Sequence, residues 1–449
     1  MEARYTFRKT QLLNECQVAP EIFEQVVPRL YTFMEPFVTI FHGQVDDQHA
    51  KTYVCGLLSD VERKNIESIA YRFGQSRLPL QSFIGSHAWD DEPLRQELRS
   101  QVKTHLGQGD GVLVFDPSGF PKSGCESVGV ARQWCGRLGK VDNCQVAIYL
   151  GYVSRQGHTL VDTRLYLPKA WTKDKARLDK AGVPQGSRRY RTRHQLALEM
   201  LAKNGASLPH SWLAGDDEMG RPAWFRRRLA TLGERYMLAV PSNTTIRDLE
   251  VEPPAASGRG RRLQRPWQSV EVWSQSLADE TWHRIDVRDG AKGPLVVEAV
   301  KRRVVSRTHR RQQGDEELLV VIRYRDRDNQ QVVKVDYYLS NAVPETPLGE
   351  LARVAKAEHR IEECLQRSKS EAGLADYEVR HWPGWHHHQT LSLLATWFLV
   401  RETERGKKMD PCDDLPADSP GHRDDLARGV SVRHDVAYAQ GAPEALATQ

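Results

Sequence analysis

Hydrophobic positions follow two different periods along the chain, and the change of period predicts helices first and strands afterwards. Between residues 51 and 73 they recur at helical spacing, with Asp60 as a candidate cap. Residues 111–115 form a short continuous apolar run, which is typical of a strand buried on both faces. Runs at 145–153 and 159–167 predict the two strands of a hairpin. A small helical region is therefore expected before an α/β region.

Later in the chain, short helices and strands alternate before a β-rich interval and two closing helices. Helices are predicted at 193–203, 222–232, 348–372 and 389–402, and strands at 211–215, 236–240, 295–305, 317–324 and 331–339. After residue 406 the chain is rich in Asp, Pro, Gly and Ala, which predicts a disordered tail. The element order indicates the α/β fold class.

Charge is distributed unevenly. The whole chain carries a formal net charge of +5, yet residues 188–265 alone hold fifteen Lys and Arg against eight Asp and Glu. Residues 402–449 hold ten acidic and six basic residues. A basic middle and an acidic tail indicate a polyanionic partner, with an ordinary solvated surface as the alternative.

Composition excludes several classes of protein. The mean hydropathy of −0.59 and the lack of an apolar run near twenty residues exclude a transmembrane helix. The first residues lack the apolar region of a signal peptide. Seven scattered cysteines without a CxxC spacing argue against a disulfide framework or a zinc knuckle, so a cytoplasmic protein is expected.

Two aspartates stand at the ends of predicted buried strands. Asp116 follows the apolar run 111–115, and Asp216 follows the strand 211–215. Ligands bind at the carboxyl ends of strands in open parallel sheets. Two such carboxylates can hold two divalent ions for phosphoryl displacement, and hard oxygen ligands favour Mg²⁺ or Mn²⁺. The alternative is that each aspartate simply makes a turn or caps a helix.

The long helix 348–372 supplies a third carboxylate. Glu362 lies beside the packed face marked by Ile361 and Leu365, and Lys369 returns to nearly the same azimuth two turns later. This stripe could provide a metal ligand and a phosphate contact, although an ordinary charged helix flank has the same pattern.

Together these motifs resemble a known family. FDPSGFPKSG (115–124), WLAGDDEMG (212–220) and HRIEECLQRSK (359–369), in this order, resemble bacterial insertion-sequence transposases of the DDE type. The stretches LLSDVERKN (57–65) and GLADYEVRHWPGW (373–385) are similar to the same group. The resemblance covers about residues 30 to 400. It implies a ribonuclease H-like catalytic core interrupted by a β-rich insertion, after an N-terminal helical domain.

The resemblance implies site residues as well. Asp116, Asp216 and Glu362 would be the catalytic, metal-binding carboxylates for two Mg²⁺ or Mn²⁺ ions, with Asp217 and Glu363 as the alternatives if the alignment shifts by one. The resemblance is greatest to the cut-and-paste subgroup, which carries a β-strand insertion between the second Asp and the Glu. This subgroup has a Tyr seven residues and an Arg four residues before its Glu, and Ala355 and Glu358 occupy these positions here. Part of the expected grip on the DNA backbone is therefore missing.

Double-stranded DNA is the expected partner, with a homodimer forming on it and the bacterial nucleoid as its location. The expected DNA contacts are Lys369, Arg360, Arg226, Arg227, Arg228, Arg188 and Arg189. One of Trp267, Trp273 and Trp282 could stack on an extruded base, but a core position is expected for each. A metal site at the His386-His387-His388 run is disfavoured, because adjacent side chains point in different directions.

The expected domains are five. They are a helical, DNA-binding domain (1–108), the first part of the catalytic domain (109–246), a β-rich insertion with a basic linker (247–346), the C-terminal helices that complete the catalytic domain (347–405) and a disordered tail (406–449). The expected function is transposition, in which the enzyme binds terminal inverted repeats, hydrolyses DNA and joins the 3′-OH ends to target DNA. The alternative is a repurposed DNA-binding protein that keeps the fold but has weakened catalysis.

Overall fold

The computed structural model describes residues 25–41, 43–253, 265–288, 295–307, 313–326 and 329–409. Within these ranges the strands are β1 (Val112–Pro121), β2 (Ala131–Cys135), β3 (Lys140–Val153), β4 (His158–Leu165), β5 (Trp212–Gly215), β6 (Tyr236–Ala239), β7 (Thr245–Asp248), β8 (Gln268–Ser269), β9 (His283–Arg288), β10 (Leu295–Arg307), β11 (Gln313–Arg325) and β12 (Val332–Ser340). They form one mixed sheet of the order β2-β3-β1-β5-β6-β12-β11-β10-β7-β8, in which β4 also pairs with β3 and β9 with β10.

Helices flank this sheet. They are α2 (Val26–Val38), α3 (Gln44–Leu58), α4 (Ile66–Arg72), α5 (Arg77–Gly85), α6 (Glu92–Leu106), α7 (Lys169–Lys173), α8 (Lys175–Lys180), α9 (Arg193–Asn204), α10 (Asp217–Gly220), α11 (Ala223–Thr231), α12 (Val270–Gln275), α13 (Leu348–Glu371) and α14 (Trp382–Met409). The predicted α/β class is confirmed. None of the described helices combines the length and apolarity that crossing a bilayer requires.

The core of the sheet has the ribonuclease H-like arrangement. β3 lies antiparallel to β1 and to β4, whereas β5 runs parallel to β1 and to β6. The apolar run of β1 is buried on both faces, as its sequence predicts. The predicted hairpin is confirmed as β3 and β4, although β3 begins five residues earlier, at Lys140.

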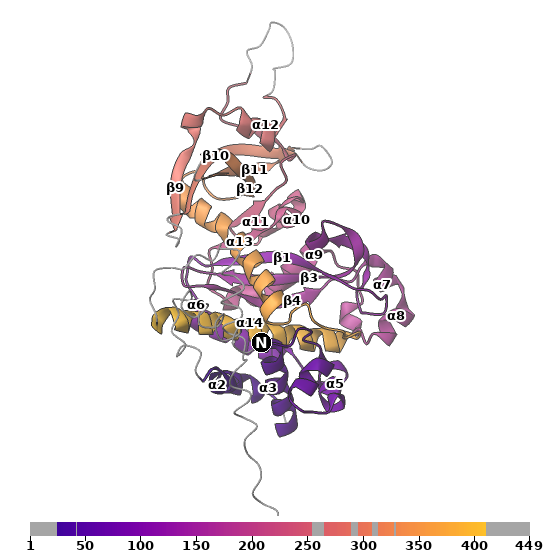
Figure 1. The fold of residues 1–449 in the computed structure, drawn as a ribbon. Helices are drawn as coiled ribbons and strands as arrows, with labels where there is room; N and C mark the ends of the chain where they lie inside the picture. Colours follow the sequence, from indigo (N-terminus) through magenta and orange to yellow (C-terminus); the bar gives the residue numbers. More distant parts are fainter. Residues whose placement is uncertain are drawn as a thin grey trace, which may run out of the picture.

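The β-rich insertion continues the core sheet. β12 pairs antiparallel with β6 of the core, and β11, β10 and β7 follow outward from it. The helix α13 then runs from the insertion strands back onto the core strands (Figure 1). The sheet and this helix therefore connect the two parts of the molecule in two places.

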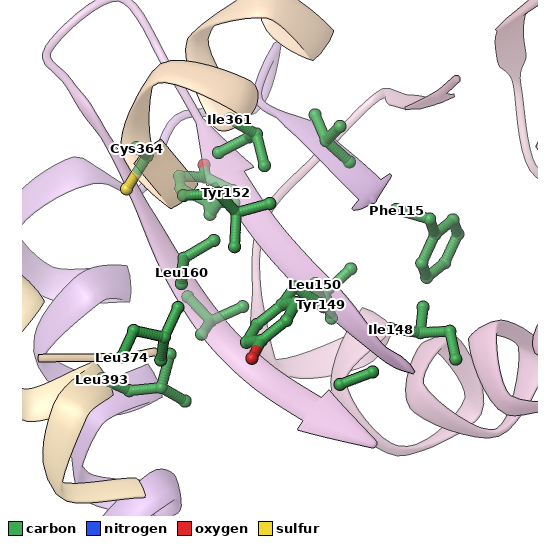
Figure 2. Packing of buried hydrophobic residues seen from close by; sticks show 14 of the residues in the cluster. Phe115, Ile148, Tyr149, Leu150, Tyr152, Leu160, Ile361, Cys364, Leu374 and Leu393 are labelled. Carbon is green, nitrogen blue, oxygen red and sulfur yellow. The ribbon is translucent and has the colours of Figure 1, made fainter. Parts of the chain in front are cut away.

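Helix α13 packs closely on the core strands. A Cβ added at Gly151 of β3 would lie 2.4 Å from Ile361 Cδ1, so only glycine admits the helix at this distance. Figure 2 shows Ile361 and Cys364 of α13 in the same apolar cluster as Tyr149 and Leu160 of the strands. This contact fixes the azimuth of α13 over the sheet.

The N-terminal helices differ from the predicted pattern in one place. Residues 51–73 contain two helices, α3 and α4, with a break between them. Asn65, and not Asp60, caps α4, because its side chain accepts a hydrogen bond from Ser68 N at 2.8 Å. These helices pack beside α14 (Figure 1), which extends to Met409, seven residues beyond the predicted end. The predicted tail lies almost entirely outside the described residues.

Candidate active site

Asp116 and Asp216 occupy equivalent places on two neighbouring parallel strands. β1 and β5 are paired so that Phe115 lies opposite Gly215, and each aspartate is the next residue. Asp216 also caps α10, accepting a hydrogen bond from Met219 N at 3.0 Å. Since both strands point the same way, the two carboxylates lie together where the parallel pairing of β1 and β5 ends. The predicted strand end is right for Asp216 but wrong for Asp116, because β1 continues to Pro121 against β3.

The two aspartates repel each other in a low-dielectric setting. Burial raises the pKa of Asp116 to about 7, Lys369 opposes this rise, and Glu362 and Glu218 add to it. Burial also raises the pKa of Asp216 well above its usual value, and the charges of Asp116, Glu218 and Glu358 raise it further. Each side chain nevertheless keeps some exposed surface. Such a site favours the binding of cations.

Helix α13 brings two carboxylates to this site. Glu362, the predicted residue, exposes 74% of its side chain and lies 3.6 Å from His359 Nδ1. Glu358, one turn earlier, is partly buried, and its pKa is raised to about 8 by burial together with Asp116, Asp336 and Glu362. Glu362 therefore lies at the rim of the site and Glu358 inside it. In the sequence, Glu358 stands out only as a departure from the family pattern.

Lys369 lies over β1, close to the first aspartate. Its Nζ donates a hydrogen bond to Ser118 Oγ at 2.6 Å and lies 5.4 Å from the centre of the Phe120 ring. Asp116, Ser118 and Phe120 alternate along β1 and so share one face. The lysine predicted from its spacing to Glu362 is therefore on the same face as Asp116.

Glu218 is a neighbour of both aspartates that sequence analysis missed. It accepts two hydrogen bonds from Arg193 of α9, at 2.8 and 2.6 Å. The run Asp216-Asp217-Glu218 indicates several carboxylates near the site, but only the geometry of α10 tells which of them face the other acidic residues. The two alternative site residues have other partners. Asp217 exposes 50% of its side chain and pairs with Arg221 at 2.8 Å, and Glu363 lies 3.3 Å from His359.

The donor set is chemically suited to hard divalent cations, because it consists of carboxylate oxygens. In the described part of the chain, however, no three His, Cys, Asp or Glu side chains are gathered closely enough to enclose an ion. The residues fit Mg²⁺ or Mn²⁺ in kind, and their side chains would have to draw together to bind it.

The arginines predicted to contact DNA occupy different environments. Arg226 has only 5% of its side chain exposed, and it bonds Glu317 of β11 at 2.6 Å and Ser306 Oγ at 2.8 Å. Its guanidinium therefore holds α11 against the insertion and has no surface left for a phosphate. Arg227 and Arg228 are both exposed, and Arg227 pairs with Asp315 at 2.8 Å.

The other predicted DNA contacts keep part of their surface. Arg188 donates to Asp179 at 2.5 Å, and Arg189 is exposed beside Arg164 and Arg191 around a cavity of about 100 Å³. Arg360 is partly buried on α13. These positions, unlike that of Arg226, leave room for a phosphate.

The histidine run is part of the core. Both ring nitrogens of His387 lie 2.9 Å from backbone carbonyls, those of Ile84 and Trp89, and its ring stacks on Trp89 at 3.7 Å. His388 Nδ1 lies 2.8 Å from the Tyr53 hydroxyl. Burial lowers the pKa of His386 to about 4 and that of His388 to about 3. These side chains join α14 to the N-terminal helices.

The three tryptophans of the insertion also differ from one another. Trp273 is buried and donates to Asp248 Oδ2 at 3.0 Å, as expected for a core residue. Trp267 is only partly buried and lies between Arg247 and Arg307, at 4.3 and 5.1 Å. Trp282 is partly buried, with Arg323 4.1 Å from its ring.

Comparison with known proteins identifies the family to which the chain belongs. Residues 36–294 match the model of the DDE superfamily endonucleases, and the chain belongs to that family. It is also similar to a probable transposase for insertion sequence element IS701 from Microchaete diplosiphon. The two are 25% identical over 333 residues, which cover 73% of this chain and 76% of the relative. The family match includes Asp116 and Asp216 but ends before α13.

Proposed function

We propose that this protein is an insertion-sequence transposase that cuts DNA at the ends of its element and joins the freed 3′-OH ends to target DNA. The observation that carries the proposal is the position of Asp116 and Asp216 at one edge of β1 and β5, beneath the carboxylates of α13. Membership of the endonuclease family and the similarity to an insertion-sequence transposase support it.

Asp116, Asp216 and Glu362 are proposed to hold two Mg²⁺ or Mn²⁺ ions. Bound ions of this kind activate the attacking oxygen and stabilise the leaving oxygen of a phosphodiester. Glu362 is preferred to Glu358 as the third ligand because its carboxylate is exposed and ion-paired, and it stands seven residues before Lys369.

The remaining residues would orient the DNA. Lys369, fixed by Ser118, presents its ammonium group beside Asp116, where a phosphate adjoining the scissile bond would lie. Arg228, Arg188, Arg189 and Arg360 are proposed as phosphate contacts. Two DNA ends would bring two copies of the chain together, so the active form is proposed to be a dimer on DNA.

One observation favours the alternative function. Glu358 places a partly buried carboxyl group where the subgroup has an arginine, so a positive charge is missing at this position of α13. A repurposed DNA-binding protein with weakened catalysis would tolerate this change.

Cleavage of the element's own ends separates the two functions. The substrate is a plasmid that carries the segments flanking the coding region, incubated with the full-length protein and Mn²⁺. We expect breaks with 3′-OH ends at fixed positions in those segments, and no breaks with Asp116→Asn, which still binds the DNA. Binding without any breaks by the wild-type protein would contradict the transposase and support the alternative.

A further inference from the structure

The hairpin formed by β2 and the start of β3 carries an exposed apolar pair at the border of the sheet. Trp134 and Val141 lie directly opposite each other across the two strands, and each exposes 53% of its surface. Leu138, in the turn between them, is 40% exposed. Cross-strand aromatic and β-branched pairs stabilise a sheet, but burial of this pair would need a partner.

Cations surround the apolar pair. Arg132, Arg137 and Lys140 are all exposed on the same hairpin. Lys140 pairs with Asp142 at 3.0 Å. In the described parts of the chain, no carboxylate lies within ion-pair distance of Arg132 or Arg137. The charges of Arg132 and Arg137 act on Asp142 and Asp376, respectively, without forming ion pairs with them, so the hairpin presents two guanidinium groups outside ion pairs.

The pair lies on the face of the sheet that carries the acidic site. Along β3, Val141 and Tyr149 are eight residues apart and therefore point to the same side, and Tyr149 lies opposite Asp116. Side chains on this face, among them Gln145 and Phe120, contact the segment after α13 through Tyr377. These contacts bury the middle of the face, so a ligand that touches both the hairpin and the acidic site has to pass over the segment after α13.

The hairpin lies beside the part of β1 that follows Asp116. A Cβ added at Gly119 would lie 2.9 Å from Cys135 Sγ and 3.4 Å from Cys135 Cα, so β2 is close to β1 three residues beyond Asp116. Arg137 follows Cys135 by two residues in the turn of the hairpin, and its charge is close enough to Lys369 to lower the pKa of that lysine, which burial already lowers. A positive track therefore runs from the acidic site toward the tip of the hairpin.

We propose that the β2–β3 hairpin is a DNA-binding element that grips the duplex beside the scissile phosphate, with Arg132 and Arg137 on phosphates and Trp134 against sugars or bases. The inference rests on the proposed function and adds a surface that the family resemblance does not assign. A second copy of the chain is a poorer occupant, because a self-complementary contact would bring these arginines face to face with their counterparts.

The test measures binding of the full-length protein to a fluorescein-labelled duplex of arbitrary sequence, in EDTA, over a range of salt concentrations. For Arg132→Ala/Arg137→Ala we expect the slope of log K against log salt to shrink by about 0.9 for each of the two contacts. For Trp134→Ala we expect binding at least fivefold weaker at every salt concentration, with the slope unchanged. The control, Arg155→Ala/Lys203→Ala, removes two exposed charges that lie outside both the hairpin and residues 1–108, and should match the wild type.

Two results would overturn the hairpin assignment. One is wild-type affinity and slope in both hairpin variants. The other is a change in sedimentation of Trp134→Ala without DNA, while its DNA binding stays normal, which would assign the patch to self-association. Metal-dependent cleavage at the element's ends is measured separately, so the transposase function can stand when the hairpin proposal fails. Wild-type protein that does not bind DNA at any salt concentration would contradict both.

Discussion

Lys369 Nζ on α13 donates a hydrogen bond to Ser118 Oγ on β1 at 2.6 Å, two residues along the strand from Asp116. This bond joins residues 251 positions apart and sets the height of the helix over the acidic site. In the proposed mechanism, this ammonium group stabilises the negative charge that develops on a bound phosphodiester.

Replacing Lys369 with alanine should therefore impair cleavage much more than folding. We expect cleavage on the order of 100-fold slower, as for the loss of a donor that stabilises a developing charge. The exposed residue Gln366, on the same helix, is the control, and Gln366→Ala should cleave at the wild-type rate. Equal rates for the two variants in single-turnover assays would remove Lys369 from the site.

The two glutamates of α13 should respond differently to neutralisation. Glu362→Gln should abolish Mn²⁺-dependent cleavage, because this exposed carboxylate is the proposed ligand. Glu358→Gln should keep most of the activity, because Glu358 is partly enclosed and its pKa of about 8 favours the neutral acid at pH 7. The opposite ranking would transfer the ligand role to Glu358, one helical turn away.

The ion pair between Arg226 and Glu317 should stabilise the junction of core and insertion. Arg226→Ala leaves the Glu317 carboxylate buried without its partner, so we expect a loss of about 3–5 kcal/mol in the free energy of unfolding. The adjacent pair, Arg227 with Asp315, is exposed, and Arg227→Ala should cost less than about 1 kcal/mol. Similar denaturant midpoints for the two variants would show that burial does not distinguish these pairs.

Asp162 of β4 should make stability depend on acid pH. It accepts hydrogen bonds from Arg95, Arg164 and Asn204 at 2.9, 2.6 and 2.7 Å. Burial would raise its pKa, but the two arginines lower it well below the ordinary value of 3.8. Its contribution is therefore present above the unfolded-state pKa and lost as pH falls toward the folded-state value.

The matching experiment compares Asp162→Asn with the wild type by urea unfolding. At pH 7 the substitution should cost about 3–5 kcal/mol, and the difference should narrow below about pH 3.9. The exposed Asp90→Asn is the control and should have little effect at either pH. A difference that stays constant down to pH 3 would mean that Asp162 is not the titrating group.

Local sequence patterns predicted the buried strands β1 and β5 and the aspartates that follow their apolar residues. A continuous apolar run signals a buried strand, and each aspartate directly follows such a run, so the meeting of Asp116 and Asp216 could be foreseen. The continuation of β1 to Pro121 could not, because Pro117, Ser118 and Gly119 have the composition of a turn. The spacing from Glu362 to Lys369 also gave the correct face of α13. These features depend on residues close together in the sequence.

Contacts between distant segments could not be read in this way. Arg226 looks like a surface arginine until Glu317, 91 residues later, is placed beside it. The pairing of β6 with β12 joins strands about a hundred residues apart, and the sequence predicted the strands without their pairing. Strand β2 was missed because Arg132, Gln133 and Trp134 lack an apolar alternation at the border of the sheet.

Crystals of the full-length protein soaked with Mn²⁺ and end DNA test the central claim most directly, through anomalous scattering from the metal. The proposed site predicts strong Mn²⁺ peaks about 2.0–2.2 Å from carboxylate oxygens of Asp116 and Asp216, with a carboxylate of α13 completing the shell. It also predicts that these peaks disappear in Asp116→Asn. Peaks located only elsewhere, or peaks that survive this substitution unchanged, would contradict the account.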